Sequence, residues 1–152
     1  MQERLVKKNE RIDDLQLNNL KLIQDPKGFC FGIDAVLLSN FCKVRDGWNV
    51  IDLGTGSGII PVLLAGKTNA KKLYGVEIQE ILAERANRSV LLNRLEDRVK
   101  IIHEDLNQIT GYFPAYSFDM VITNPPYMQR GGGIPNPKSD RAIARHEIKA
   151  TL

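Results

Sequence analysis

The sequence predicts an α/β fold with a doubly wound parallel sheet, and two observations lead to that prediction. Short apolar segments alternate along the chain with longer segments whose apolar residues have helical spacing. A glycine-rich turn, Gly54 to Gly58, joins the first core strand directly to the helix that follows it. Because strands that alternate with helices pair in parallel, this pattern favours a doubly wound sheet. At 152 residues, 43% of them hydrophobic, the chain suits one compact domain with one core.

Residues 1–32 are expected to form an N-terminal extension that contains one short strand. In residues 19–24 polar and apolar side chains alternate, as in a strand, and Asp25-Pro26-Lys27-Gly28 then supplies a turn. Residues 33–152 are assigned to the main domain. It begins with a helix at residues 33–41, where the apolar residues have helical spacing.

The rest of the main domain alternates between strands and helices. Pro61 is compatible with a helix because it falls in the first turn, where a missing N–H matters little. We expect strands at residues 49–53, 72–76, 99–103 and 118–123, and helices at residues 59–65, at residues 79–93 and from residue 140 onward.

Composition and charge exclude several classes of protein. Lys and Arg outnumber Asp and Glu by only 21 to 18, a surplus that permits RNA binding without requiring it. Residues 1–14 lack an apolar signal core, and the longest uncharged apolar run, residues 59–65, is too short to span a bilayer. These features predict a cytoplasmic protein without a membrane anchor. Cys30 and Cys42 lack metal-ligand spacing and are expected to be buried free thiols, so no metal site is predicted.

Glycines and acids follow the expected strands in positions that suit a nucleoside cofactor. Gly54, Gly56 and Gly58 let the backbone turn sharply into a helix and approach a ligand, and their spacing differs from the dinucleotide fingerprint. Glu77 ends the second core strand, where a carboxylate can accept hydrogen bonds from a ribose diol. Asp105 follows the third strand and is suited to accept a hydrogen bond from an adenine amino group. Ordinary tight turns and solvated acids are the alternative.

The segment Asn124-Pro125-Pro126-Tyr127 follows the fourth core strand and predicts an acceptor site. Two prolines fix the conformation of this loop more firmly than a simple turn needs. We expect the side-chain oxygen of Asn124 and the carbonyl of Pro125 to accept the two hydrogens of a planar amine, while Tyr127 stacks on its ring. Stacking on an aromatic ring contributes about 1–3 kcal/mol to holding a base that has been extruded from its nucleic-acid strand. A proline turn that merely ends a strand is the alternative.

Through Asp52 to Gly58, Glu77, Asp105 and Asn124 to Tyr127, the chain resembles the class I S-adenosyl-L-methionine-dependent methyltransferases. Residues 31–38 (FGIDAVLL) and residues 141–145 narrow the resemblance to the bacterial adenine-N6 methyltransferases that modify valine tRNA beside the anticodon.

The resemblance implies a Rossmann-like class I methyltransferase sheet, S-adenosyl-L-methionine as the cofactor and N6-methylation of an adenine in tRNA. It places Gly54, Gly56 and Gly58 at the methionine part of the cofactor, Glu77 at the ribose and Asp105 at the adenine. Asp34 and Asp52 are expected in the same pocket. Transfer would be an in-line displacement that depends on positioning and needs no general base, because the amine becomes acidic only after attack.

The family sheet has seven strands, whereas this sequence supplies four core strands. The sheet is therefore expected to be truncated after the fourth, with an exposed apolar edge and an undetermined oligomeric state. A basic surface beside the acceptor loop is expected to contact RNA, through Arg130, Lys138, Arg141, Arg145 and Lys149. Two alternatives stay open: a methyltransferase of a glutamine side-chain amide in a protein, and a non-catalytic module that binds the cofactor or RNA.

Overall fold

Four parallel strands form the sheet that carries the candidate site. The computed structural model describes residues 2–125 of the chain. Within them the strands are β3 (Asn49–Leu53), β4 (Lys72–Glu77), β5 (Val99–His103) and β6 (Met120–Thr123), in the spatial order β5-β4-β3-β6. Each neighbouring pair is parallel, as the sequence predicts.

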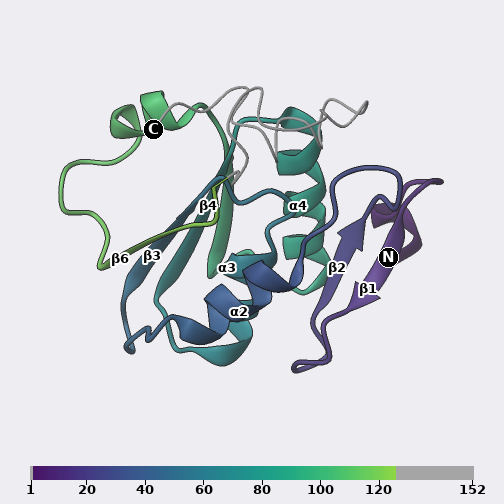
Figure 1. Cartoon of the computed structure of the whole chain (residues 1–152), viewed down its shortest axis with the longest axis horizontal. Helices are drawn as coiled ribbons and strands as arrows, with labels where there is room; N and C mark the ends of the chain where they lie inside the picture. Colours follow the sequence, from purple (N-terminus) through teal and green to yellow (C-terminus); the bar gives the residue numbers. More distant parts are fainter. Residues whose placement is uncertain (1, 126–152) are drawn as a thin grey trace.

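Three helices lie on one side of this sheet (Figure 1). They are α2 (Ile33–Phe41), α3 (Ile59–Lys67) and α4 (Glu80–Leu92). Residues from α3 and α4 share one hydrophobic core with strand residues Val50, Leu73 and Ile101. The chain therefore winds from β3 through α3, β4 and α4 to β5 in one direction, and β6 then returns to the other side of β3.

An aromatic cluster marks a second contact region at β4. Tyr74 lies with its ring centroid 5.1 Å from that of Phe113 and 5.5 Å from that of Phe118, in edge-to-face geometry. Such contacts stabilise the packing of rings beyond the area they bury. The cluster attaches the segment between β5 and β6, which includes a short 3₁₀ helix, η1 (Leu106–Gly111), that the sequence analysis did not anticipate.

The N-terminal extension forms a hairpin rather than the single strand that was expected. Strand β1 (Arg11–Asp14) pairs antiparallel with β2 (Lys21–Gln24), which is shorter than the predicted strand at residues 19–24. A further short helix, α1 (Gln2–Leu5), precedes them. Strand β1 escaped prediction because three of its four residues are charged and give no apolar alternation.

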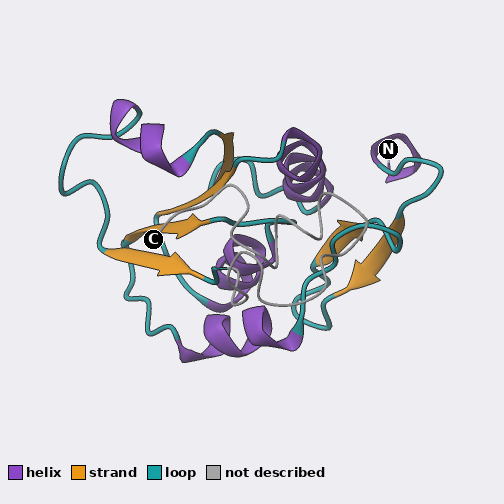
Figure 2. Cartoon of the chain, turned by 45° about the horizontal axis from the view of Figure 1, so that its top comes forward, coloured by secondary structure: helices purple, strands orange, loops and turns teal. Residues whose placement is uncertain are grey.

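The hairpin packs against α4, which separates it from the sheet (Figures 1 and 2). The side-chain amide of Asn93, at the end of α4, donates to the Lys21 carbonyl at 2.7 Å and accepts from its N–H at 2.8 Å. The hydroxyl of Ser89 accepts a hydrogen bond from the N–H of Ile23 at 3.0 Å. These contacts satisfy the backbone of β2 on its side toward the helix.

A buried ion-pair network fixes the segment before the hairpin. Glu10 has only 5% of its side chain exposed and bonds to Arg85 and Arg88, which are 6% and 11% exposed. Burial alone would raise the pKa of Glu10, but hydrogen bonds from Arg88, from the Lys7 N–H and from Arg85 outweigh it and lower the pKa to about 2. The carboxylate is therefore ionised at neutral pH.

Most expected elements of the main domain are confirmed, with small differences at their ends. Helix α2, β3 and β5 have the predicted bounds, whereas β6 begins at Met120 instead of residue 118. Strands β5 and β6 are the two edge strands of the sheet that residues 2–125 form, and Val121 in β6 is 59% exposed. The helix predicted from residue 140 lies outside the described residues.

Candidate functional site

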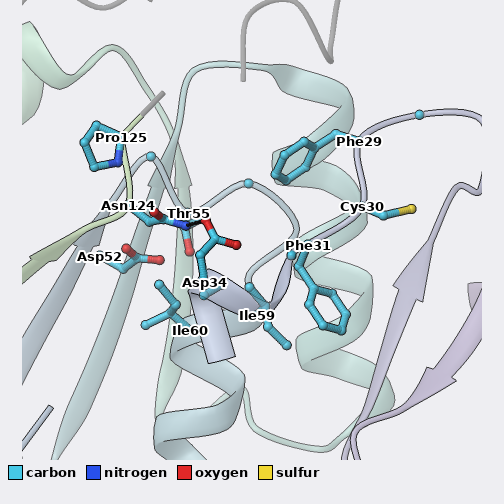
Figure 3. A pocket seen from close by; sticks show the side chains of 15 residues that line it. Phe29, Cys30, Phe31, Asp34, Asp52, Thr55, Ile59, Ile60, Asn124 and Pro125 are labelled. Carbon is cyan, nitrogen blue, oxygen red and sulfur yellow. Dashed lines mark hydrogen bonds between the residues drawn. The ribbon is translucent and has the colours of Figure 1, made fainter. Parts of the chain in front are cut away.

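A cavity opens where the strand order of the sheet reverses. In open α/β sheets, ligands bind in the crevice beyond the carboxyl ends of the strands at such a switch point. Here the reversal falls between β3 and β6. The cavity has a volume of about 270 Å³ and is lined by residues from three segments: 28–35, 52–60, and Asn124 with Pro125 (Figure 3).

The glycine loop borders the cavity and has the backbone shape that the sequence predicts. Gly54, Gly56 and Gly58 have φ angles of 75°, 58° and 81°. Positive φ is costly for residues with a Cβ, so the turn depends on glycine. At Gly56 a Cβ would also lie 2.9 Å from the Phe29 ring, too close for ordinary packing. Gly54 and Gly56 line the cavity, whereas Gly58 lies behind them at the start of α3.

Asp52 places a buried carboxylate at the wall of the cavity. It lies near the end of β3, is 2% exposed, and neither of its oxygens has a hydrogen-bond partner among residues 2–125. Burial raises its pKa to about 7; the Thr55 hydroxyl works against this rise, and the Glu77 charge adds to it. A buried polar group without a partner is costly, so this carboxylate favours a ligand that supplies a positive charge or N–H donors.

Glu77 holds the glycine loop in place from the end of β4. Its carboxylate accepts hydrogen bonds from the N–H of Gly56 at 2.8 Å and of Gln79 at 2.9 Å. Burial raises the pKa of Glu77, although these backbone N–H groups partly offset the effect. The side chain is 5% exposed and does not line the cavity itself. Through this contact, the end of β4 holds the loop that follows β3.

Asp105 follows β5 and caps η1 rather than entering the cavity. Its Oδ1 accepts from the backbone N–H and the side-chain amide of Asn107, at 2.8 and 2.9 Å. The other carboxylate oxygen is not used in these bonds. Asp105, Glu77 and the glycine loop thus follow three neighbouring strands at one edge of the sheet.

The predicted acceptor residues follow the fourth strand along the same edge. Asn124 and Pro125 come directly after β6, whose neighbour β3 leads into the glycine loop, and both residues line the cavity (Figure 3). The side-chain nitrogen of Asn124 donates a hydrogen bond of 2.7 Å to Oδ2 of Asp34, in the first turn of α2. Pro126 and Tyr127, the rest of the predicted acceptor motif, lie outside the described residues, as do the five basic residues proposed for RNA contact.

Sequence reasoning missed two residues of the site. Phe29 lies beside the glycine loop and contributes an aromatic wall to the cavity (Figure 3). Thr55 is 4% exposed, and its hydroxyl has no hydrogen-bond partner in the described part of the chain. The placement of Phe29 near Gly56, 27 residues away in sequence, requires the tertiary fold. Thr55 stood within the recognised motif, where only the glycines were considered.

The described residues give no sign of metal ligation or of a membrane span. No group of three or more His, Cys, Asp or Glu residues in this part of the chain is arranged to hold a metal ion. Between residues 2 and 125, no helix is long and apolar enough to cross a membrane. Cys30 and Cys42 are half-buried, less so than the sequence predicts, and the thiol of Cys30 donates a hydrogen bond to the Asp25 carbonyl at 3.3 Å.

The comparison with protein families agrees with this geometry. The model of the methyltransferase small domain matches residues 26–136 of the chain. The chain belongs to the methyltransferase small domain family. The match includes all three segments that line the cavity, together with Glu77 and Asp105. The predicted resemblance to methyltransferases is therefore confirmed at the level of this family.

Two curated relatives of this methyltransferase domain carry the same name. A tRNA1(Val) (adenine(37)-N6)-methyltransferase from Aliivibrio salmonicida is 31% identical over 119 residues, which are 78% of this chain and 49% of that protein. One from Pedobacter heparinus is 32% identical over 113 residues, or 74% of this chain and 46% of the relative. The chain thus spans about half the length of the curated relatives that it matches.

Solved structures show the same fold for the methyltransferase domain. A tRNA methyltransferase from M. jannaschii has a TM-score of 0.61 at 23% identity, covering 78% of this chain and 36% of that one. M. capricolum TrmK, solved with the natural cofactor product S-adenosyl-homocysteine, has a TM-score of 0.53 at 15% identity, covering 62% and 41%. Together with the parallel sheet, these likenesses confirm the predicted Rossmann-like α/β class.

Proposed function

We propose that this chain carries the cofactor-binding part and the acceptor asparagine of an S-adenosyl-L-methionine-dependent methyltransferase that modifies N6 of an adenine in tRNA. The observation that supports it most is the juxtaposition of two segments in one cavity. The glycine loop and Asp52 line the same cavity as Asn124 and Pro125, which follow the neighbouring strand β6. A methyl donor and an amine acceptor would thus meet at the switch point of the sheet.

The residues present fit S-adenosylmethionine in three respects. Asp52 offers an unpartnered buried carboxylate to the ammonium group of the methionine part. The positive φ angles at Gly54 and Gly56 keep side chains out of the way, so that a ligand can approach the backbone closely. At the next two strand ends, each oxygen of Glu77 accepts one backbone N–H and has a second acceptor position for a ribose hydroxyl, and Asp105 has one oxygen outside its bonds to Asn107 for the adenine amine.

The order of these groups follows the order of the strands. Asp105, Glu77, the glycine loop and Asn124 follow β5, β4, β3 and β6 in turn. Neighbouring strands lie about 4.8 Å apart, so the row of four spans roughly 14 Å. An extended nucleoside ligand with its adenine at Asp105 would therefore have its amino-acid end, and its sulfur, near β3 and the acceptor residues. The cavity at β3 and β6 is then one end of a longer site.

The residues of the chain act mainly by positioning. S-Adenosylmethionine supplies a methyl group on a positively charged sulfur, which an amine nitrogen can displace. Asn124 Oδ1 and the Pro125 carbonyl accept the hydrogens of the amine and hold its nitrogen in the attack geometry. Such alignment of reactants can supply a large part of the rate enhancement of a transfer reaction. The aromatic wall at Phe29 and the buried surroundings of Asp52 exclude water from the donor side.

The tRNA substrate is supported by the names of the relatives and by the acceptor motif. Both relatives described above are named for adenine N6 methylation in tRNA1(Val). Tyr127 would stack on the extruded base, and the basic residues beyond it would contact phosphates. Valine tRNA, next to the anticodon, is accordingly the first substrate to test. A tRNA substrate would also place the reaction in the cytoplasm.

Transfer of a labelled methyl group tests the proposal. The purified chain would be incubated with labelled S-adenosylmethionine and one acceptor at a time. The acceptors are valine tRNA, other tRNAs and proteins. We expect label in N6-methyladenine of valine tRNA, and loss of transfer of about 100-fold or more in Asn124→Ala. Asn69→Ala is the matched control, because Asn69 is an exposed loop residue before β4, remote from the carboxyl ends of the strands. Label in a protein glutamine would instead support the amide alternative.

Calorimetric titration separates binding from transfer. Selective binding of S-adenosylmethionine over NAD, without transfer to any acceptor, would support a non-catalytic module. Failure of the folded chain to bind S-adenosylmethionine would contradict the cofactor assignment. Unchanged transfer in Asn124→Ala would remove the acceptor role from this residue.

A further inference from the structure

A hydrogen bond between Asp34 and Asn124 joins the start of α2 to the segment after β6. Asp34 lies in the first turn of α2, and Asn124 lies 90 residues later, directly after β6. The Asn124 amide nitrogen donates to Asp34 Oδ2 at 2.7 Å, and both side chains line the cavity. Figure 3 shows the two side chains pointing toward one another.

We propose that Asp34 is a positioning residue that fixes the orientation of the Asn124 amide and thereby selects an acceptor that donates hydrogen bonds. This inference rests on the function proposed above, in which Asn124 holds the amine. It assigns Asp34 to the acceptor side of the site, in addition to the cofactor pocket where the sequence placed it.

The chemistry of the two side chains explains the selection. An ionised carboxylate can only accept hydrogen bonds, whereas an asparagine amide has a donating and an accepting end. Asp34 therefore bonds to the nitrogen of Asn124 and disfavours the flipped orientation, in which two oxygens would face each other. With the nitrogen held in this way, the amide oxygen is left to accept from an amine. A free amide would populate both orientations and would present a donor to the amine part of the time.

Gly32 provides the space that this arrangement needs. A Cβ at Gly32 would lie 2.5 Å from Oδ1 of Asp34, so any larger residue must displace the carboxylate. The backbone of Gly32 has a φ of −101° and does not itself require glycine. The absence of a side chain at this position is thus explained by the position of Asp34 and not by the conformation of the turn.

Asp34 also has a structural role that must be separated from positioning. An acid in the first turn of a helix interacts favourably with the helix dipole, and the cap of α2 has no side-chain hydrogen bond. Loss of Asp34 could therefore loosen α2 and lower stability. That effect would reduce the folded fraction, but it would not depend on which substrate is varied in a kinetic experiment.

Steady-state kinetics with Asp34→Ala, Asp34→Asn and Gly32→Ala test the proposal. For Asp34→Ala we expect kcat/KM for valine tRNA to fall roughly 10- to 100-fold, as for the loss of a hydrogen bond to a charged group, with cofactor affinity by calorimetry within about 2-fold. Asp34→Asn should recover part of the loss, because its side-chain oxygen can still accept from Asn124. Gly32→Ala should resemble Asp34→Ala while keeping both side chains. Asp46→Ala and Asp46→Asn are the matched controls, since Asp46 lies in an exposed turn.

Two kinetic results would overturn the inference. If Asp34→Ala weakened cofactor binding and left kcat unchanged at saturating cofactor, Asp34 would be a cofactor ligand. If Asp34→Ala and Gly32→Ala matched the Asp46 variants, the contact would have no part in the reaction. A double variant, Asp34→Ala with Asn124→Ala, should be no slower than Asn124→Ala alone, because the two residues act as a unit.

A spectroscopic measurement decides the inference even if no acceptor is methylated. The side-chain amide protons of Asn124, assigned by their loss in Asn124→Ala, should exchange slowly with water and shift in both Asp34→Ala and Gly32→Ala. Identical signals in the wild-type chain and in these variants would contradict a role of Asp34 in holding the amide. Failure of methyl transfer by the wild-type chain would count against the proposed function alone.

Discussion

The buried acid at the end of β3 should make the stability of this protein fall as pH rises. Asp52 is 2% exposed, and its pKa is raised from 3.8 to about 7. A carboxyl group whose pKa is raised by folding binds its proton more tightly in the folded state. Its favourable contribution is fully present below pH 3.8 and is lost as pH rises through about 7. The substitution Asp52→Asn removes this titration and keeps the shape of the side chain.

The size of the effect follows from the shift. One pKa unit corresponds to about 1.4 kcal/mol, so a shift of about 3 units corresponds to roughly 4 kcal/mol between the two limits of pH. Between pH 5 and pH 8 the expected change is roughly 2–3 kcal/mol, because part of the titration lies below that window. The free energy of unfolding of Asp52→Asn, measured against the wild type, should therefore increase by this amount from pH 5 to pH 8.

Urea unfolding at half-unit steps of pH provides the assay. The difference between wild type and Asp52→Asn cancels the groups that titrate independently of this carboxyl, whereas Glu77, whose charge adds to the rise in the Asp52 pKa, stays coupled to it. Glu10 does not interfere, because its pKa of about 2 lies below the window. A difference in unfolding free energy that stayed constant from pH 5 to pH 8 would refute the reasoning. It would mean that the acid is ionised with a near-normal pKa, or that it is protonated throughout.

Three further predictions concern the loop, the hairpin and the cofactor. Gly56→Ala should weaken S-adenosylhomocysteine binding in calorimetry, because the new Cβ would collide with the Phe29 ring. Gly47→Ala is the control: Gly47 also has a positive φ, but a Cβ there would have no atom within 4 Å, so the variant should lose stability without losing affinity. Glu10→Gln should lower the free energy of unfolding by about 1.5–3 kcal/mol, because Arg85 and Arg88 lose their shared buried carboxylate and keep only their outer partners, Asp25 and Glu84. Glu84→Gln, at a side chain that is 43% exposed, should lower it by less than about 1 kcal/mol. The affinity for S-adenosylhomocysteine should rise as pH rises through about 7 in the wild type and stay constant in Asp52→Asn, because only the ionised acid attracts an ammonium group. An equal change of affinity with pH in both proteins would contradict a contact between Asp52 and the ammonium group.

The fold of the main domain could be predicted because its elements carry local signals. Each core strand is a short apolar run that ends in glycine, proline or an acid, and each helix has apolar residues at helical spacing. The positive φ angles of the glycine loop follow from the same logic, since three glycines in five residues have little other use. Predictions of this kind depend on neighbours in sequence, and the structure bears them out.

The contacts between distant segments could not be predicted in this way. Strand β1 is held by pairing with β2 and by the bonds of Glu10 to α4, so its charged sequence gives no signal of its own. Phe29 lies in a turn whose sequence shows only turn chemistry, yet the fold brings it to the glycine loop. The bond between Asp34 and Asn124 likewise depends on the fold, which brings the first turn of α2 to the segment after β6. Sequence reasoning placed both residues in the pocket but could not pair them.

The strand order also explains why acids after successive strands were informative. An acid on a helix surface is solvated and can be replaced freely, whereas an acid at the carboxyl end of a parallel strand faces a crevice shared with its neighbours. Glu77 is the clearest case: it is buried, its pKa is raised, and it uses its oxygens to fix the backbone of the loop from the next strand. A buried carboxylate destabilises the folded protein unless it is hydrogen-bonded. Its presence at the end of β4 therefore indicates that the loop must keep one shape. A loop held in that shape, beside the unpartnered Asp52 and the oriented amide of Asn124, is suited to bind a charged ligand next to an amine.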